Sequence, residues 1–226
     1  PYHSGFRSPY GGSLAAPESP LQAATIAAWD MQESSGPLLP AKGSIEIPAF
    51  NSPGTAAGPV AGISSREIVA GQSQRFQSPD TAQLFHATSK IIRCWMKFND
   101  GGSTFSHVLV QKGLDNVNST DDEWALFLTG IPPSQSRFRT RNAVNSIFED
   151  NLAFVVDASS VDIWLRFELN GFDSKIRIHN INGVTLLDDA ITLPPSFGTA
   201  PIVLGEDNGT GIGAEYTAMA IFNRQL

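Results

Sequence analysis

The sequence predicts an all-β fold in which two antiparallel sheets pack face to face. Apolar residues recur at every second position in several segments, which is the period of a strand with one buried face. The segments are short, and turn-forming residues separate them in a chain with 20 glycines and 15 prolines. No segment predicts a helix of useful length. These patterns are typical of a β-sandwich or a barrel.

The two clearest strands are predicted over residues 91–98 and 161–169, and each has one apolar face. The apolar face of the first comprises Ile92, Cys94, Met96 and Phe98. The apolar face of the second comprises Val161, Ile163, Leu165, Phe167 and Leu169. Further patterns predict strands over 108–112, 123–128, 153–157, 175–179, 201–205 and 216–222, and that over 123–128 is strong. The Asn170-Gly171 dipeptide predicts a hairpin turn, and we interpret residues 134–148 as a strand with one solvated basic face.

The chain divides into an extended arm, residues 1–22, and a sandwich domain, residues 23–226. The arm is rich in proline and glycine and cannot bury enough apolar surface to fold alone. Tyr2, Phe6 and Tyr10 recur every four residues in it. They are either chance aromatics or anchors that bind a groove on a partner.

Charge and composition exclude several classes of function. The net charge of −7 and the pI of 5.0 argue against a nucleic-acid partner. No run of about 18 apolar residues predicts a membrane span, and the N-terminal residues do not resemble a signal peptide. The single cysteine, Cys94, allows no internal disulfide, and its apolar neighbours predict a buried, inert thiol.

Six segments in order resemble the laminin-G-like, concanavalin A-like domains of bacterial and phage proteins. The first has Trp29, Glu33 and Gly36 in a W-x-hydrophobic-x-E-x-x-G pattern. The others are residues 92–97, 108–113, 163–171, 202–205 and 220–226. The resemblance implies a two-sheet antiparallel jelly-roll sandwich of the concanavalin A type. It implies architecture more than activity, because this fold carries many unrelated functions.

No catalytic set emerges from the sequence, so we expect a protein that is not an enzyme. The sandwich hydrolases use two glutamates around an aspartate on one strand, and no such E-x-D-x-E string occurs. The four histidines lack zinc-binding spacing.

The candidate binding residues lie on one predicted strand face and in oxygen-rich loops. Trp164, Arg166 and Glu168 share a face, and with Trp124 they are predicted to contact a ligand; the alternative for Trp164 is a rim residue packed under a loop. Clustered side-chain oxygens suggest calcium as the one cofactor to consider, the alternative being a solvated loop. The candidate calcium ligands are Asp115, Asn116, Asp121 and Asp122.

Two functions are consistent with these features. The first is a structural or interaction protein of a phage virion, assembled in the host cytoplasm and displayed on the particle surface. Its partners would be other virion or capsid proteins, or further copies of itself in a homo-oligomer. The second is a carbohydrate-binding module or lectin that binds surface glycans, with or without calcium.

Overall fold

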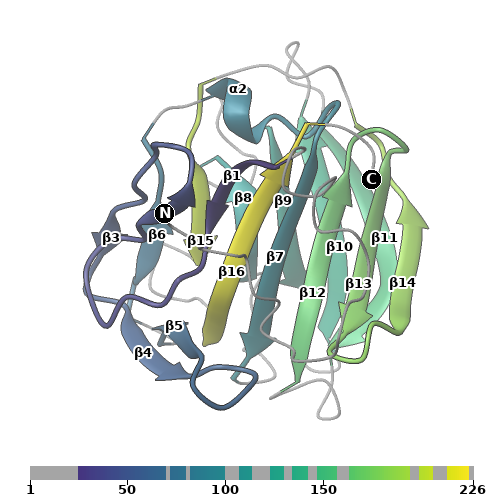
Figure 1. The fold of residues 1–226 in the computed structure, drawn as a ribbon. Coiled ribbons are helices and arrows are strands. Elements are labelled where there is room, and N and C mark those ends of the chain that lie inside the picture. Colours follow the sequence, from purple (N-terminus) through teal and green to yellow (C-terminus); the bar gives the residue numbers. More distant parts are fainter. Residues whose placement is uncertain are drawn as a thin grey trace.

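The structure is an all-β, two-sheet fold (Figure 1). The computed structural model describes residues 25–69, 72–79, 82–99, 107–113, 123–129, 134–141, 147–156, 163–193, 199–205 and 213–223. The described helix, α2, covers only Ala82–Phe85. No helix among the described residues is long and apolar enough to cross a membrane. The prediction of two antiparallel sheets is confirmed.

Strands distant in sequence lie side by side in both sheets. The nine-stranded sheet contains, in spatial order, β14 (Thr185–Ala190), β13 (Lys175–Asn180), β12 (Trp164–Asn170), β7 (Ile91–Phe98), β16 (Ala214–Phe222), β1 (Thr25–Trp29) and β2 (Pro40–Lys42), with β5 (Ser64–Ile68) paired to β16 and β4 (Gly54–Ala57) paired to β5. The seven-stranded sheet contains β11 (Ile147–Val156), β10 (Ser134–Arg141), β9 (Trp124–Thr129), β8 (His107–Lys112), β15 (Ile202–Gly205), β6 (Arg75–Gln77) and β3 (Ala49–Phe50).

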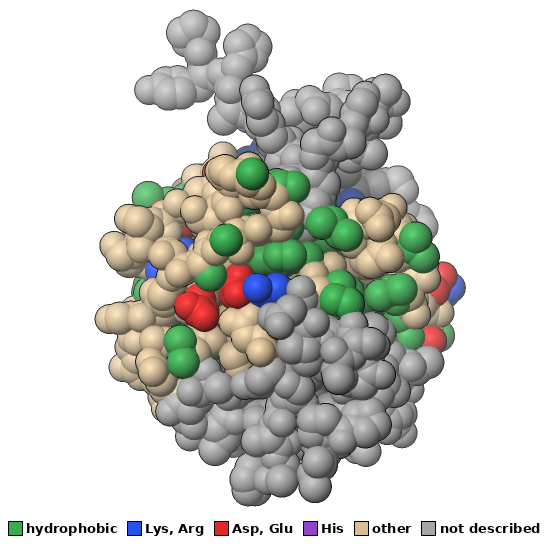
Figure 2. All heavy atoms as spheres, turned by 90° about the horizontal axis from the view of Figure 1, so that it is seen from below, with side chains coloured by type: hydrophobic (Ala, Val, Ile, Leu, Met, Phe, Trp, Pro, Cys, Tyr) green, Lys and Arg blue, Asp and Glu red, His purple; other side chains and the backbone are tan. Residues whose placement is uncertain are grey.

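The core fills the space between the sheets, and the predicted alternation places most of it correctly. The apolar faces of β7 and of β12 from Leu165 to Leu169 are buried. Ile163 was expected to share that face, but it is 39% exposed because β12 begins only at Trp164. β12 starts at the lower end of the molecule in Figure 1, and Figure 2, which views the molecule from below, shows hydrophobic side chains at the surface there. Val161 lies outside the described residues.

The tryptophans divide between the core and the surface of the sheet. Trp29 is fully buried and stacks on Phe85, with ring centroids 6.0 Å apart. The prediction that Trp124 contacts a ligand is wrong, because its ring is also fully buried and its Nε1 donates a hydrogen bond to the carbonyl oxygen of Phe85. Trp95 is partly exposed and lies on the opposite face of β7 from Cys94.

A cluster of buried charges closes one end of the core beside α2. The Lys112 side chain is fully buried, and its Nζ lies 3.2 Å from Oε2 of Glu123. The same oxygen lies 2.5 Å from Nδ1 of His86, while Oε1 accepts a hydrogen bond from the backbone N–H of Ala87. Glu123 therefore neutralises a buried ammonium and holds the segment after α2 in place.

The turn between β12 and β13 explains the glycine of the predicted hairpin. Asn170 pairs with Lys175, so the connection has four residues rather than the two of a tight Asn-Gly turn. A Cβ atom on Gly171 would lie 1.8 Å from the carbonyl oxygen of Ala87, so only glycine fits at this close approach. The contact between Gly171 and Ala87 therefore fixes the position of the hairpin of β12 and β13, which carries most residues of the candidate site.

Candidate functional site

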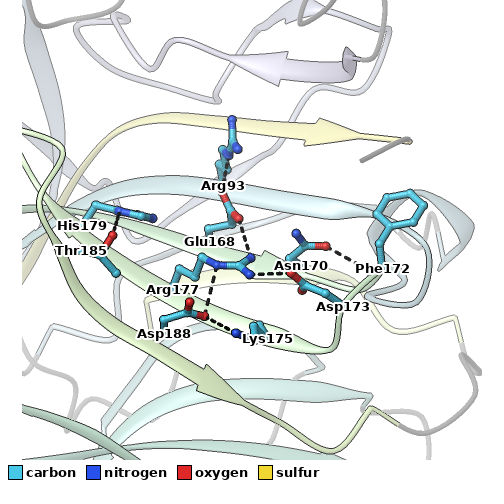
Figure 3. Close-up of polar contacts among 10 residues, drawn as sticks. All are labelled: Arg93, Glu168, Asn170, Phe172, Asp173, Lys175, Arg177, His179, Thr185 and Asp188. Atoms are coloured by element: carbon cyan, nitrogen blue, oxygen red, sulfur yellow. Dashed lines mark hydrogen bonds and ion pairs between the residues drawn. The ribbon is translucent and has the colours of Figure 1, made fainter. Parts of the chain in front are cut away.

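The site lies on the outer face of the nine-stranded sheet, which we define as the side of β7, β12, β13 and β14 that points away from the core. Strand register places four residues of alternating charge directly opposite one another across these four strands. The row runs Arg93, Glu168, Arg177 and Asp188. Figure 3 shows Glu168 between the two arginines, with Asp188 beyond Arg177.

Glu168 is the centre of this row. Its side chain is 6% exposed, and its carboxylate accepts hydrogen bonds from Nε of Arg93 at 2.6 Å and from Nη1 of Arg177 at 3.3 Å, one on each oxygen. Arg177 also reaches Asp173 at 2.5 Å and Asp188 at 3.3 Å. Because both of its oxygens are occupied, Glu168 acts as an internal counterion that positions Arg93 and Arg177.

The protonation of Glu168 follows from these contacts. Burial by itself would raise the pKa of the carboxyl group, since it disfavours the charged form. The charge and hydrogen bond of Arg93, with the charges of Arg166 and Arg177, outweigh burial and hold the pKa below its ordinary value. Glu168 is therefore ionised at neutral pH and is not suited to be a general acid.

A pocket of about 300 Å³ opens on the outer face beside Glu168. We call it the Glu168 pocket. Its main polar lining comprises Arg93, Arg166, Glu168, Asn170, Arg177 and His179. Asp173 adds a second carboxylate and Ile91 an apolar wall. Three guanidinium groups against two carboxylates give the lining a net charge of +1, in a chain whose net charge is −7.

A second row of side chains adjoins the first on the outer face. Trp95, Arg166 and His179 lie opposite one another on β7, β12 and β13. The guanidinium carbon of Arg166 lies 6.0 Å from the centre of the Trp95 ring, at the limit of a cation–π contact. Nδ1 of His179 lies 3.1 Å from Oγ1 of Thr185. Aromatic, cationic and imidazole groups thus meet at one edge of the pocket.

Two polar atoms of this pocket have no hydrogen-bond partner among the described residues. They are Nε of Arg166 and Oδ1 of Asp173, and both atoms are buried. An unpaired buried donor or acceptor costs about 1–3 kcal/mol. The pocket therefore holds one donor and one acceptor that form no hydrogen bond with any residue that the structure describes.

The histidine in this site makes folding stability depend on pH. Burial, followed by the charge of Arg166, lowers the pKa of His179 below its ordinary value of 6.5; Arg93 and Arg177 act in the same direction and Glu168 against it. As pH falls below 6.5, the unfolded chain binds this proton more readily than the folded chain, so stability is lost.

We expect the wild-type protein to lose more free energy of unfolding between pH 7.5 and pH 5.5 than a His179→Gln variant does. Urea unfolding at the two pH values measures the difference, and the other histidines act as a shared background. Equal losses in both proteins would contradict the assigned environment of His179.

The structure separates the predicted site residues into three groups. Arg166 and Glu168 line the pocket. Trp164 lies on the same strand face beside Lys97, but it is only 8% exposed and does not line the pocket. Trp124 belongs to the core. The predicted arm anchors and calcium ligands lie outside the described residues: Tyr2, Phe6, Tyr10, Asp115, Asn116, Asp121 and Asp122.

Sequence reasoning missed six of the eight lining residues, namely Ile91, Arg93, Asn170, Asp173, Arg177 and His179. Alternation had placed Arg93 on the polar face of its strand, and a hairpin register would have placed Arg177 opposite Glu168. Within the described part of the chain, no group of three or more histidine, cysteine or acidic side chains is arranged to hold a metal ion.

Comparison with known proteins identifies relatives in fold but not in sequence. No protein-family model matches the chain, and no curated protein matches its sequence. Solved structures do match.

One is the binding domain of Paraclostridial Mosquitocidal Protein 1, with a TM-score of 0.63, 13% identity, and 91% of this chain aligned to 50% of that one. Two others are structures of the binding domain of botulinum neurotoxin DC. The one in complex with rat synaptotagmin II has a TM-score of 0.60 and 14% identity over 90% of this chain and 49% of that one. The one in complex with SialylT has a TM-score of 0.59 and 13% identity over 90% and 48%.

This chain shares its fold with part of those domains. It spans about half of their length, and identities of 13–14% carry no residue roles from them to this chain.

Proposed function

We propose that this chain is a non-enzymatic binding domain that recognises carbohydrate at the Glu168 pocket. The observation that carries the proposal is the pairing of an unused donor, Nε of Arg166, with an unused acceptor, Oδ1 of Asp173, in one open pocket. A sugar hydroxyl both donates and accepts hydrogen bonds, so a sugar with several hydroxyls can satisfy both atoms. Such a ligand would remove the cost of leaving them unpaired.

The surroundings of the pocket support a sugar over a flat apolar ligand. Polar side chains dominate the lining, while Trp95 beside it is partly exposed and Phe172, on the turn, is 38% exposed. Aromatic rings of this kind provide surfaces for the C–H faces of a sugar ring. The binding domain of botulinum neurotoxin DC has a similar fold and was solved in complex with SialylT, and this similarity of fold adds support to the proposal.

The arrangement of carboxylates favours binding over hydrolysis. Glycoside hydrolysis needs one carboxyl group that gives a proton and a second that acts as a nucleophile or base. Glu168 is held by two arginines, and Asp173 contacts Arg177 through Oδ2. The pKa of Glu168 is held below its ordinary value by the neighbouring arginines, so this carboxyl does not give a proton at neutral pH.

A glycan array probed with and without calcium tests this proposal. We expect the wild-type protein to bind a defined group of glycans, and Asp173→Asn to reduce that binding about 10-fold or more, because a neutral amide is a weaker acceptor than a carboxylate. Asp30→Asn is the matched control, since Asp30 is exposed and lies outside the pocket. Binding at background level for the wild-type protein would overturn the proposal. If chelation changes neither binding nor the melting temperature, the predicted calcium site is wrong.

The role as a phage virion component remains a prediction. It is based on the resemblance to domains found in phage proteins and on the arm of residues 1–22 with Tyr2, Phe6 and Tyr10. A virion surface protein that holds host glycans would combine this role with the proposed binding function.

The assignment of the sandwich to the concanavalin A-like jelly rolls is likewise a proposal. The motifs that support it include Trp29, on β1, and the Asn170-Gly171 turn between β12 and β13.

A further inference from the structure

We infer that the carbohydrate bound at the Glu168 pocket carries a carboxylate, as an acidic sugar does, and that Arg166 is the residue that binds this carboxylate. The inference rests on the function proposed above and specifies its ligand class. It follows from the way the charges of the pocket are paired, which leaves one of the three arginines without a carboxylate contact.

Two of the three arginines are already committed. Arg93 donates to Glu168 at 2.6 Å, and Arg177 contacts Glu168, Asp173 and Asp188. Arg166 makes no ion pair with any described residue, and its Nε is buried without a hydrogen bond. Arg166 is therefore the only arginine in the pocket lining that contacts no carboxylate among the described residues.

The environment of Arg166 disfavours its own charge. Burial lowers the pKa of the guanidinium group, the neighbouring charge of Arg93 lowers it further, and Glu168 only partly compensates. A ligand carboxylate would supply the absent counter-charge. The edge of a guanidinium group that includes Nε presents two parallel N–H donors, which match the two oxygens of a carboxylate.

The neighbours of Arg166 suit the rest of such a ligand. Trp95 lies on one side of it and His179 on the other, each directly opposite in strand register. Oδ1 of Asp173 remains available as an acceptor, but only for a neutral donor such as a hydroxyl, because its charge repels a second carboxylate. An acidic sugar offers both groups on one ring.

The test uses acidic oligosaccharides and their methyl esters, which keep the sugar but remove the charge. The probes are galacturonate, glucuronate and N-acetylneuraminate oligosaccharides, each beside its methyl ester, with a sulfated galactan oligosaccharide as a further arm. We expect wild-type protein to bind at least one acid about 10-fold or more tightly than its ester, the effect of one charge-assisted hydrogen-bonded contact. Titration calorimetry on the full chain measures the dissociation constants.

Variants of Arg166 assign this difference to one residue. Arg166→Gln is expected to bind acid and ester with similar affinity. Arg166→Lys is expected to keep part of the preference for the acid, because lysine retains the positive charge but lacks the two parallel N–H donors of the guanidinium group. Lys42→Gln is the matched control, because Lys42 is exposed on β2 and its replacement changes net charge equally. Melting temperatures show that each variant is folded; if Arg166→Gln does not fold, the comparison uses Arg166→Lys.

The outcomes separate the inference from the proposed function. If wild-type protein binds esters as tightly as acids, or binds the sulfated sugar and no carboxylate, the inference is overturned while carbohydrate binding stands. A preference for acids that Arg166→Gln retains overturns the role of Arg166. If no sugar on the array or in this panel binds, the proposed function fails.

Discussion

Replacing Glu123 by alanine is expected to lower the free energy of unfolding by about 3–5 kcal/mol, the usual cost of leaving one member of a buried ion pair without the other. The Lys112 side chain that Glu123 neutralises is fully buried, so the ammonium group cannot recover its hydration without disrupting the structure. His86 and the backbone N–H of Ala87 lose an acceptor in the same change. Equilibrium urea unfolding measures the effect.

A double variant distinguishes an unpaired charge from simple loss of packing. Lys112→Met combined with Glu123→Leu replaces the pair by apolar side chains of similar size, and we expect most of the lost stability to return. A cost below about 1 kcal/mol for Glu123→Ala, or a double variant as unstable as the single one, would show that the pair is not buried as described.

The second large effect concerns two phenylalanines of the same hairpin. Phe167 is 1% exposed in the core, whereas Phe172 is 38% exposed on the turn only five positions later. Phe167→Ala is expected to cost about 3–5 kcal/mol, because it removes buried apolar surface and leaves a cavity. Phe172→Ala makes the same chemical change at the surface and is expected to cost less than about 1 kcal/mol.

The matched pair tests which face of β12 is the inner one. Thermal unfolding, monitored by circular dichroism, measures the loss of stability in each of the two variants. A cost below about 1 kcal/mol at Phe167 would contradict the placement of its side chain on the inner face of β12.

The sequence was informative wherever a strand was long and regularly alternating. The predicted strand over 91–98 coincides with β7 because apolar and polar residues alternate through its whole length. Strands such as β3 and β6 have two or three residues, too few for a period to be visible. β14 was missed because Leu186 and Leu187 are adjacent in the sequence and break the alternation, and a register shift opposite His179 accommodates the extra residue.

The candidate site could be predicted only in part, and the reason lies in strand order. Alternation gave Arg166 and Glu168 a shared face, but nothing in a single sequence shows that β7 lies beside β12, since more than sixty residues separate them. Without that neighbour, Arg93 has no partner to identify it. Trp124 was misplaced because Ala125 and Phe127 are also apolar, so its strand has no polar face from which to decide the orientation.

The central claim is that the two faces of the nine-stranded sheet have different roles, one forming the core and the other binding the ligand. Two-dimensional NMR of the four tryptophan indole N–H groups, titrated with the best glycan from the array, tests it directly. The account predicts that the Trp95 signal shifts with saturation, while the signals of the buried Trp29 and Trp124 remain in place. Shifts confined to Trp29 and Trp124, with no change at Trp95, would contradict it.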